Sequence, residues 1–207
     1  PLWVLGETTY ALLGDGRLAV THGRGESRLS LLDPGTGVLT SLGLDLGFGP
    51  EVGASGSTVT STAVSDTLPY AVVAIDVAAD PPTVDVVRRS TAELPASAFL
   101  PRAQPRTFTG PGGREIHAFV YPPTHPEAAA PDGELPPYLA FVHGGPTAHV
   151  SPGLSLDKAY FTSRGIGVID VNYGGSTGYG RAYRERLRRQ WGVVDVEDTV
   201  AAVRALA

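Results

Sequence analysis

The sequence predicts a chain built in two parts, an all-β amino-terminal half followed by an α/β half with a mostly parallel sheet. The first half alternates short apolar runs with Gly- and Pro-rich turns and has no convincing amphipathic helix. In the second half, continuous apolar strands alternate with helical patterns, an order typical of parallel sheets. The pattern changes near Pro105, so we place the domain boundary between residues 104 and 105.

Composition and charge favour a folded, soluble protein and exclude several classes of function. Of the 207 residues, 42% are hydrophobic, and the formal net charge of −5 offers no basic surface for nucleic acid. No apolar run reaches the roughly 18 residues of a membrane helix, and the amino terminus lacks the pattern of a signal peptide. We therefore expect a cytoplasmic protein without nucleic-acid or membrane partners. The absence of Cys excludes disulfides and thiolate chemistry.

Two features of the sequence predict a fragment of a longer protein. The chain contains no Met and begins with Pro1. Near its other end, Val196, Val200 and Val203 follow a helical spacing that continues to Ala207 with no Gly or Pro after it. We expect a helix that is cut at its carboxy-terminal end.

The amino-terminal half, residues 1–104, contains two similar series of short apolar runs. Each series has a hairpin-type turn, at 33–37 in the first and at 79–82 in the second. Leu32-Asp33 and Ile75-Asp76 end the strands before these turns, at a spacing within the roughly 40 to 45 residue period of propeller blades. We predict the last blades of a β-propeller, while a β-sandwich with regular turns is the alternative that spacing alone leaves open.

The second half, residues 105–207, predicts strands that alternate with helices. Apolar runs at 138–142 and 166–171 are typical of buried parallel strands, and the short helix predicted between them, at 156–164, is stopped by Gly165. A strand at 115–121 precedes these elements, and two more helices are predicted after them, at 180–190 and 194–207.

The tetrapeptide His143-Gly144-Gly145-Pro146 directly follows the predicted strand at 138–142. In α/β-hydrolases this is the position of an HGG-type loop that supplies one donor of the oxyanion hole. Paired glycines let the backbone turn sharply and approach a substrate carbonyl, so that an N–H can point at the negative oxygen of a tetrahedral intermediate. The tetrapeptide alone is equally compatible with a Gly-Gly-Pro turn beside a structural His.

The segments around this loop resemble the prolyl oligopeptidase family of serine peptidases. The resemblance rests on AYFTSRG at 159–165, on VIDVNY and GSTGYGR within 168–181, and on WGVVDVED at 191–198. The last run is similar to the segment that precedes the nucleophile in the acylaminoacyl-peptidase and dipeptidyl-peptidase-like branch. The resemblance covers residues 107–207, whereas over 1–104 only the type of architecture is similar. Gly174 departs from the family, which usually has Arg there.

The resemblance implies a serine peptidase that hydrolyses short peptides from their amino-terminal side through an acyl-enzyme. It assigns the backbone N–H of Gly145 as an oxyanion donor, Gly144 as the residue that shapes the turn, and His143 as a support of the loop. It implies that residues 105–207 are the amino-terminal part of an α/β-hydrolase domain that stops before the nucleophile elbow. The Ser, Asp and His of the triad would then lie beyond Ala207, in the remainder of the same polypeptide.

Two other functions remain open at this point. One is an esterase on the same hydrolase fold, and the other is a non-enzymatic module in which the propeller binds a partner. We expect the fragment alone to be inactive, and an oligomer is compatible with the sequence.

Residues 174–178, GGSTG, match the G-x-S-x-G pattern of a nucleophile elbow, but we reject Ser176 as the nucleophile. An elbow is a sharp strand-to-helix turn, whereas Tyr179 and Gly180 lengthen this connection into a loop. Moreover, no His follows Ser176 in the chain, although the triad of this fold has its His last.

Two other groups of residues carry no predicted site. The helix predicted at 180–190 is rich in arginine, and we expect these side chains to form a solvent-exposed face because acidic residues lie among them and after them. The arginines are Arg181, Arg184, Arg186, Arg188 and Arg189. No metal or cofactor is predicted, because paired spacing or nearby acids are lacking at His22, His117, His125 and His149.

Overall fold

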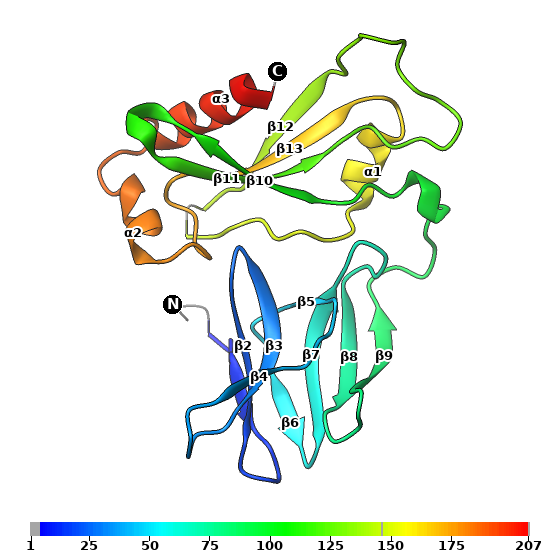
Figure 1. Ribbon diagram of the computed structural model, residues 1–207, viewed down its shortest axis with the longest axis vertical. Helices are drawn as coiled ribbons and strands as arrows, with labels where there is room; N and C mark the ends of the chain where they lie inside the picture. The colour runs from blue at the N-terminus through cyan, green and yellow to red at the C-terminus, as the bar shows by residue number, and fades with distance from the viewer. Residues whose placement is uncertain (1–4, 146, 207) are drawn as a thin grey trace. The chain divides into compact units, whose positions relative to one another are not determined.

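The computed structural model describes residues 5–145 and 147–206 and divides the chain into two compact units, Pro1–Glu93 and Leu94–Ala207 (Figure 1). This boundary differs from the one predicted at residues 104/105. Short apolar side chains between the two positions belong to the second unit, because Leu94 and Leu100 pack with Leu154 of that unit.

The first unit consists of two antiparallel sheets (Figure 1). The first sheet follows chain order, with β1 (Tyr10–Leu12), β2 (Leu18–Arg24), β3 (Glu26–Leu32) and β4 (Leu39–Ser41). The second sheet has the order β5 (Gly47–Phe48), β7 (Thr58–Val64), β8 (Ala71–Asp76) and β9 (Thr83–Arg89), with β6 (Gly53–Ser55) paired to β7. The two series of apolar runs in the sequence therefore form two separate sheets.

The core of the first unit follows from the alternation of side chains along each strand. In β7, Val59 and Ala63 are buried, and they join Val73 and Ile75 of β8 in one apolar cluster. The first sheet contributes Ala19 and Leu31, among other side chains, to the same cluster. One shared core thus holds the two sheets together.

The second unit is built on a four-stranded sheet in the order β10-β11-β13-β12. The strands are β10 (Gln104–Thr109), β11 (Glu115–Tyr121), β12 (Tyr138–Val142) and β13 (Gly167–Asn172). Within the described residues only β12 and β13 are parallel, so this sheet is mixed and the expectation of a mostly parallel sheet is corrected. The tight turn η2 (Pro111–Gly113) accounts for the antiparallel pair of β10 and β11, since such a short connection joins antiparallel strands.

The helices follow the predicted order, and two of them are shorter than predicted. The predicted helix at 156–164 corresponds to α1 (Leu156–Thr162), where the Ser155 side chain accepts a hydrogen bond from Lys158 N, and the last predicted helix corresponds to α3 (Val194–Leu206). The predicted helix at 180–190 is shorter, with α2 (Arg181–Arg184) followed by η3 (Glu185–Leu187). The only remaining helical turn in the described chain is η1 (Ser97–Phe99). No helix in the described ranges is long and apolar enough to cross a membrane.

Strand β13 is buried along its whole length and lies between β11 and β12. Its apolar residues Val168, Ile169 and Val171 face both sides of the sheet without exposure to solvent. Because a central strand is held from both edges, its carboxyl end gives a fixed position for the residues that follow it.

Candidate functional site

The candidate site is the loop that follows β12, residues 143–151, with residue 146 outside the described chain. Strands β12 and β13 are parallel neighbours, and Val142 pairs with Val171 at their carboxyl ends. The loop therefore begins beside the segment that follows β13. Carboxyl ends of strands are where ligands bind in open α/β sheets.

His143 is held by this neighbouring segment through its side chain and its main chain. Its Nε2 lies 2.7 Å from Ser176 Oγ. Its ring stacks on the Tyr173 ring, with a centroid separation of 4.5 Å and an interplanar angle of 15°. The Tyr173 hydroxyl also donates a hydrogen bond to the carbonyl oxygen of His143, at 2.9 Å. The residue directly before Gly144 is thus fixed at three points.

Both ring nitrogens of His143 face oxygen atoms. Nε2 faces the hydroxyl of Ser176, which itself donates to the carbonyl oxygen of Tyr173 at 2.8 Å, and Nδ1 lies 3.2 Å from the carbonyl oxygen of Gly144. Burial lowers the pKa of His143, and the carbonyl of Gly144 and the charge of Asp170 oppose that shift. Burial thus favours the neutral form of the ring.

Gly144 and Gly145 present an open backbone. Both residues are exposed, and no atom lies within 4 Å of a Cβ placed at either position. Gly145 has φ +57°, in the left-handed region that favours glycine, whereas Gly144 is not among the residues with positive φ. Within the described chain, the N–H of Gly145 donates to no backbone carbonyl or side chain. This amide is available to an incoming acceptor, and its assignment as an oxyanion donor stays a prediction.

The rest of the loop is also tied to the segment after β13. The side chain of Asn172, fully buried, forms a pair of bonds with Val150: it accepts from the amide at 2.8 Å and donates to the carbonyl at 3.0 Å. The amide of Thr177 donates to the carbonyl of Ala148 at 2.9 Å, and its hydroxyl lies 2.9 Å from His149 Nδ1. The loop is therefore anchored on both sides of Gly144 and Gly145.

Sequence reasoning missed these partners of the loop. Asn172, Tyr173 and Thr177 carried no predicted role, because their contacts join residues more than twenty positions apart. The signal in the sequence is the run of polar residues that begins at Asn172, at the end of a mostly apolar strand.

Ser176 and His143 resemble a Ser–His dyad in distance, but the surroundings of Ser176 argue against nucleophilic chemistry. Ser176 is fully buried, and its hydroxyl proton is directed to the carbonyl of Tyr173. The Ser176 amide donates to the same carbonyl at 3.0 Å. A nucleophile must reach the substrate and pass its proton to the base, so Ser176 has the geometry of a structural hydroxyl that holds His143.

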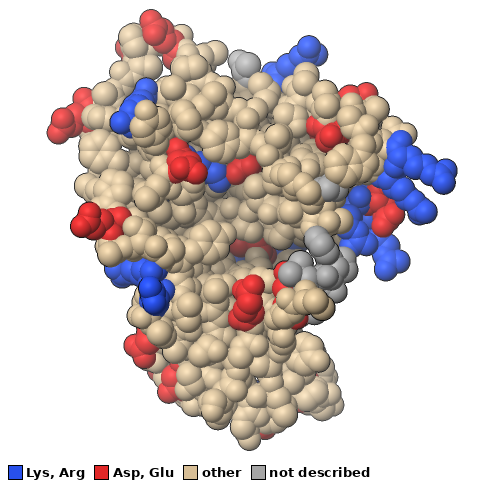
Figure 2. All heavy atoms as spheres, turned by 180° about the vertical axis from the view of Figure 1, so that it is seen from behind, with Lys and Arg blue, Asp and Glu red and all other residues tan. Residues whose placement is uncertain are grey.

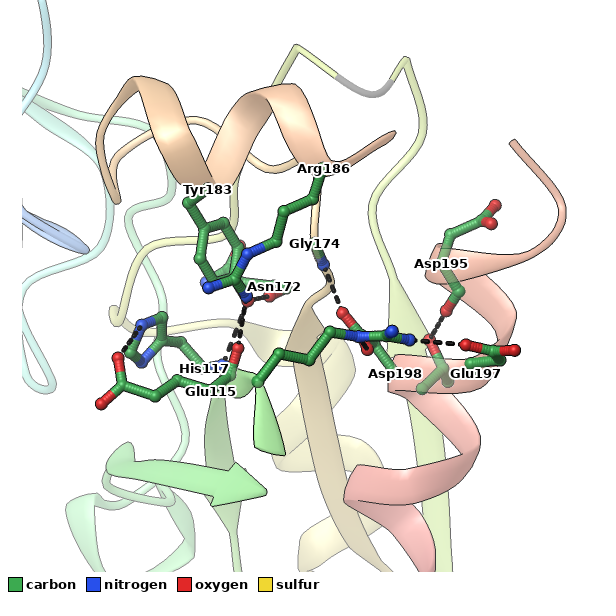
Figure 3. Close-up of polar contacts among 11 residues, drawn as sticks. Glu115, His117, Asn172, Gly174, Tyr183, Arg186, Asp195, Glu197 and Asp198 are labelled. Atoms are coloured by element: carbon green, nitrogen blue, oxygen red, sulfur yellow. Dashed lines mark hydrogen bonds and ion pairs between the residues drawn. The ribbon is translucent and has the colours of Figure 1, made fainter. Parts of the chain in front are cut away.

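Gly174 lies in a position that a side chain does not fit. Its amide donates to Asp198 Oδ2 at 2.8 Å (Figure 3). A Cβ at this position would lie 2.8 Å from Asp198 Oδ2 and 2.8 Å from Val194 Cγ1, with Arg186 Cδ at 3.2 Å. The Arg that is usual in the family therefore does not fit on this backbone unless these neighbours move.

The remaining residues considered in the sequence form no site with the loop. Figure 2 shows a group of basic side chains at the right edge with acidic side chains among them, and other basic side chains elsewhere on the same face. In the basic segment, Glu185 lies 3.6 Å from Arg184 and 4.0 Å from Arg188, and Arg186 lies over the Tyr183 ring. Among the residues that the structure describes, no three or more His, Cys, Asp or Glu side chains gather as a metal site.

Comparison with known proteins adds a family match and whole-chain structural matches. Residues 152–207 match the model of the Prolyl oligopeptidase family. The dipeptidyl peptidase family member 6 of Caenorhabditis elegans is 34% identical over an alignment of 93 residues, and the match covers 37% of this chain and 13% of that protein. The acylamino-acid-releasing enzyme of Arabidopsis thaliana is 40% identical over 73 residues, 35% of this chain and 9% of that enzyme.

Two solved structures match the chain over its whole length. A puromycin-hydrolyzing peptidase of Mycobacterium tuberculosis is 58% identical with a TM-score of 0.95, and the match covers 100% of this chain and 32% of that chain. A puromycin hydrolase is 48% identical with a TM-score of 0.93, over 100% of this chain and 31% of that chain. The chain thus spans about a third of these structures and a smaller share of the curated relatives. Residues 152–207 thus match the prolyl oligopeptidase family, in agreement with the motifs of the sequence.

Proposed function

We propose that the chain forms the last blades of a β-propeller and the first half of an α/β-hydrolase domain in a serine peptidase, and that it supplies one oxyanion donor, the N–H of Gly145. The observation that carries the proposal is the position of the open Gly145 amide, at the carboxyl end of β12 in a loop that the segment after β13 holds on both sides. The triad would come from polypeptide that follows residue 207.

In the reaction that we propose, the serine oxygen attacks the carbonyl carbon of the scissile amide and its proton passes to the catalytic His. The carbonyl oxygen becomes negative in the tetrahedral intermediate, where the Gly145 N–H donates to it. Collapse of the intermediate breaks the C–N bond, and the His returns the proton to the leaving amine. Loss of one oxyanion donor raises the barrier by about 3 to 4 kcal/mol in comparable enzymes.

The proposed substrates are short peptides and aminoacyl amides that are cleaved near their amino terminus. Both whole-chain structural matches are named for the hydrolysis of puromycin, and a mutant of one of them was solved in complex with PGG. Puromycin carries an aminoacyl group on an amide nitrogen, so peptide and puromycin present the same scissile bond. The curated relatives are named as dipeptidyl peptidases and an acylamino-acid-releasing enzyme, which favours a peptidase over an esterase.

An exposed apolar row on the first sheet supports the propeller part of the proposal. Leu12, Leu18, Leu32 and Leu39 lie opposite one another on adjacent strands and share one face of the sheet. Leu12 and Leu39 are exposed by 66% and 46%. Since a blade packs both faces against its neighbours, this row is where a preceding blade would pack.

The edge strand β12 supports the hydrolase part. It is the last strand in the order of its sheet, and Leu139 and Val142 remain exposed by 37% and 54%. A further parallel strand paired to this edge would cover such side chains. We propose that this strand carries the Gly-x-Ser-x-Gly elbow in the remainder of the polypeptide.

Labelling with a fluorophosphonate probe tests the proposed function. The full-length protein should be labelled at one Ser beyond residue 207 and should release the aminoacyl group from puromycin and from aminoacyl p-nitroanilides. The Ser176→Ala variant serves as the control and should keep the label. Labelling at Ser176 would refute the assignment of that residue, and hydrolysis of simple esters without amide hydrolysis would indicate an esterase. A protein without label or turnover would indicate the interaction module.

A further inference from the structure

We propose that Asp198 is a positioning residue for the loop 143–145, an inference that rests on the proposed function of that loop. Its carboxylate holds the Tyr173–Gly174 peptide from the side opposite to the loop. This peptide in turn holds Ser176, and Ser176 holds His143.

Asp198 is a buried carboxylate whose two oxygens bind different partners. It lies on α3 and is fully buried. Because burial of a charge is costly, both oxygens of a buried carboxylate need hydrogen-bond partners. Oδ1 accepts from Arg114 Nε at 2.6 Å and Oδ2 accepts from the amide of Gly174 at 2.8 Å (Figure 3). A Cβ at Gly110 would lie 3.3 Å from Oδ1, so the backbone encloses this oxygen closely.

The bond to Gly174 orients a complete peptide unit. The amide of Gly174 and the carbonyl of Tyr173 belong to one planar peptide, and in the trans form they point in opposite directions. Asp198 holds the N–H side. On the other side, the Tyr173 carbonyl accepts from the amide of Ser176 at 3.0 Å and from its hydroxyl at 2.8 Å.

The same peptide determines how His143 is held. With its proton donated to the Tyr173 carbonyl, the Ser176 hydroxyl presents its oxygen to His143 Nε2 at 2.7 Å. The Tyr173 ring stacks on the imidazole, and its hydroxyl donates to the main chain of His143. A rotation of the Tyr173–Gly174 peptide would therefore disturb the residue that directly precedes Gly144 and Gly145.

Attachment of α3 to the sheet does not by itself require the hydrogen bond between Asp198 and Gly174. Arg114 already joins α3 to the turn before β11 through Glu197 at 2.7 Å, a bond that does not involve the loop. The side chain of Glu197 is 46% exposed, whereas Asp198 is fully buried and one of its oxygens accepts a hydrogen bond from the amide of Gly174. This difference provides a matched pair of variants on adjacent residues.

The test compares Asp198→Asn with Glu197→Gln in the full-length protein. In Asp198→Asn one carboxylate oxygen is replaced by an NH2 group, which cannot accept a hydrogen bond. The one remaining oxygen cannot accept from both Arg114 and Gly174 in the present geometry, so we expect the Tyr173–Gly174 peptide to lose its orientation. We expect kcat for amide hydrolysis to fall about 10- to 100-fold, as for small displacements of catalytic groups, with KM within about twofold of wild type. Glu197→Gln should leave both constants within about twofold, although it also weakens the bond to Arg114.

A double-mutant cycle separates positioning from general stability. If Asp198 acts through Ser176, then Asp198→Asn and Ser176→Ala should lower kcat by similar factors, and the double variant should be no worse than the single variants. A double variant whose loss of kcat equals the product of the two single losses would refute the proposal. So would a folded Asp198→Asn protein with the kcat of wild type, or an equal loss of kcat in Glu197→Gln.

Amide exchange in the wild-type protein gives an answer that depends neither on folding of the variant nor on activity. The Gly174 N–H, bonded to a buried carboxylate, should exchange with solvent at least about 100-fold more slowly than the open Gly145 N–H. Similar exchange rates at the two glycines would overturn the proposal. Activity and probe labelling of the wild type test the proposed function separately, so the failure of one inference is distinguishable from failure of the other.

Discussion

Replacement of Gly145 by Ala tests whether the left-handed backbone at this residue keeps the loop amide in place. At φ +57° a Cβ costs roughly 1–2 kcal/mol. No atom lies within 4 Å of that Cβ, so steric clash adds nothing. Gly144→Ala is the matched control, because Gly144 is equally open but has no positive φ. The two variants differ only in backbone strain.

The strain can be converted into an expected loss of activity. A cost of one to two kcal/mol lowers the population of the present loop conformation by a factor of about 5 to 30. Other conformations turn the Gly144–Gly145 peptide and its N–H away from the oxyanion. We expect kcat of Gly145→Ala to fall about 5- to 30-fold with little change of KM, below the roughly 100- to 1,000-fold loss for complete removal of a donor.

The assay is the hydrolysis of an aminoacyl p-nitroanilide by the full-length variants, with thermal melts to confirm that each is folded. Gly144→Ala should stay within about twofold of wild type, because an exposed position without strain changes stability little. The reasoning is refuted if Gly145→Ala keeps full kcat, or if both variants lose kcat to the same extent. The second result would mean that the loop tolerates no side chain at all, whatever its backbone conformation.

Two further predictions concern stability. In the buried ion pair between Lys158 and Asp170, Nζ and Oδ2 are 2.6 Å apart, so Asp170→Asn should lower the free energy of unfolding by about 3–5 kcal/mol in urea denaturation. Glu26→Gln, at the half-exposed pair with Arg28, should cost about 1 kcal/mol or less, and equal losses would contradict the argument. Because folding lowers the pKa of His143, the unfolded chain binds a proton at this residue more readily than the folded chain does. The contribution of His143 to the free energy of unfolding is therefore complete above about pH 6.5, and it is lost as the pH falls through the pKa of the folded state. The melting temperature of wild type should therefore fall more between pH 8 and pH 5 than that of His143→Gln, and parallel curves would show that His143 does not contribute.

Several features of this protein followed from the sequence because they depend on local pattern. Two series of apolar runs with similar turns predicted the strands that became two sheets. The change of pattern near Pro105 coincides with the start of β10 at Gln104, although the second unit itself begins at Leu94. The runs at 138–142 and 166–171 form the strands β12 and β13, and β13 is buried because a central strand is covered on both faces. The expectation of a buried strand at 138–142 was wrong, because β12 is the last strand of its sheet and leaves Leu139 and Val142 exposed. The HGG loop was located by its place after a strand.

Where the sequence pattern was insufficient, longer-range packing decided the outcome. Leu94 and Leu100 belong to the second unit because they meet Leu154, a contact that no local period encodes. The sheet is mixed because β11 pairs antiparallel with the distant strand β13 as well as with β10, although the strand-helix alternation after β11 suggested parallel strands. The helix expected at 180–190 was also shorter, and Gly180 offers no side chain to cap α2.

For the site, the sequence by itself determined which residues the loop contains and that glycines occupy its turn. Only the tertiary structure decided how the loop is held, because β12 and β13 must first pair before His143 can meet Tyr173 and Ser176. The same holds for Asp198, which is one acid among several in the sequence of α3 and becomes the buried partner of Gly174 only when the helix packs on the sheet. Hydrogen bonds between distant segments require the whole fold, whereas turns, strands and glycine conformations require only their neighbours.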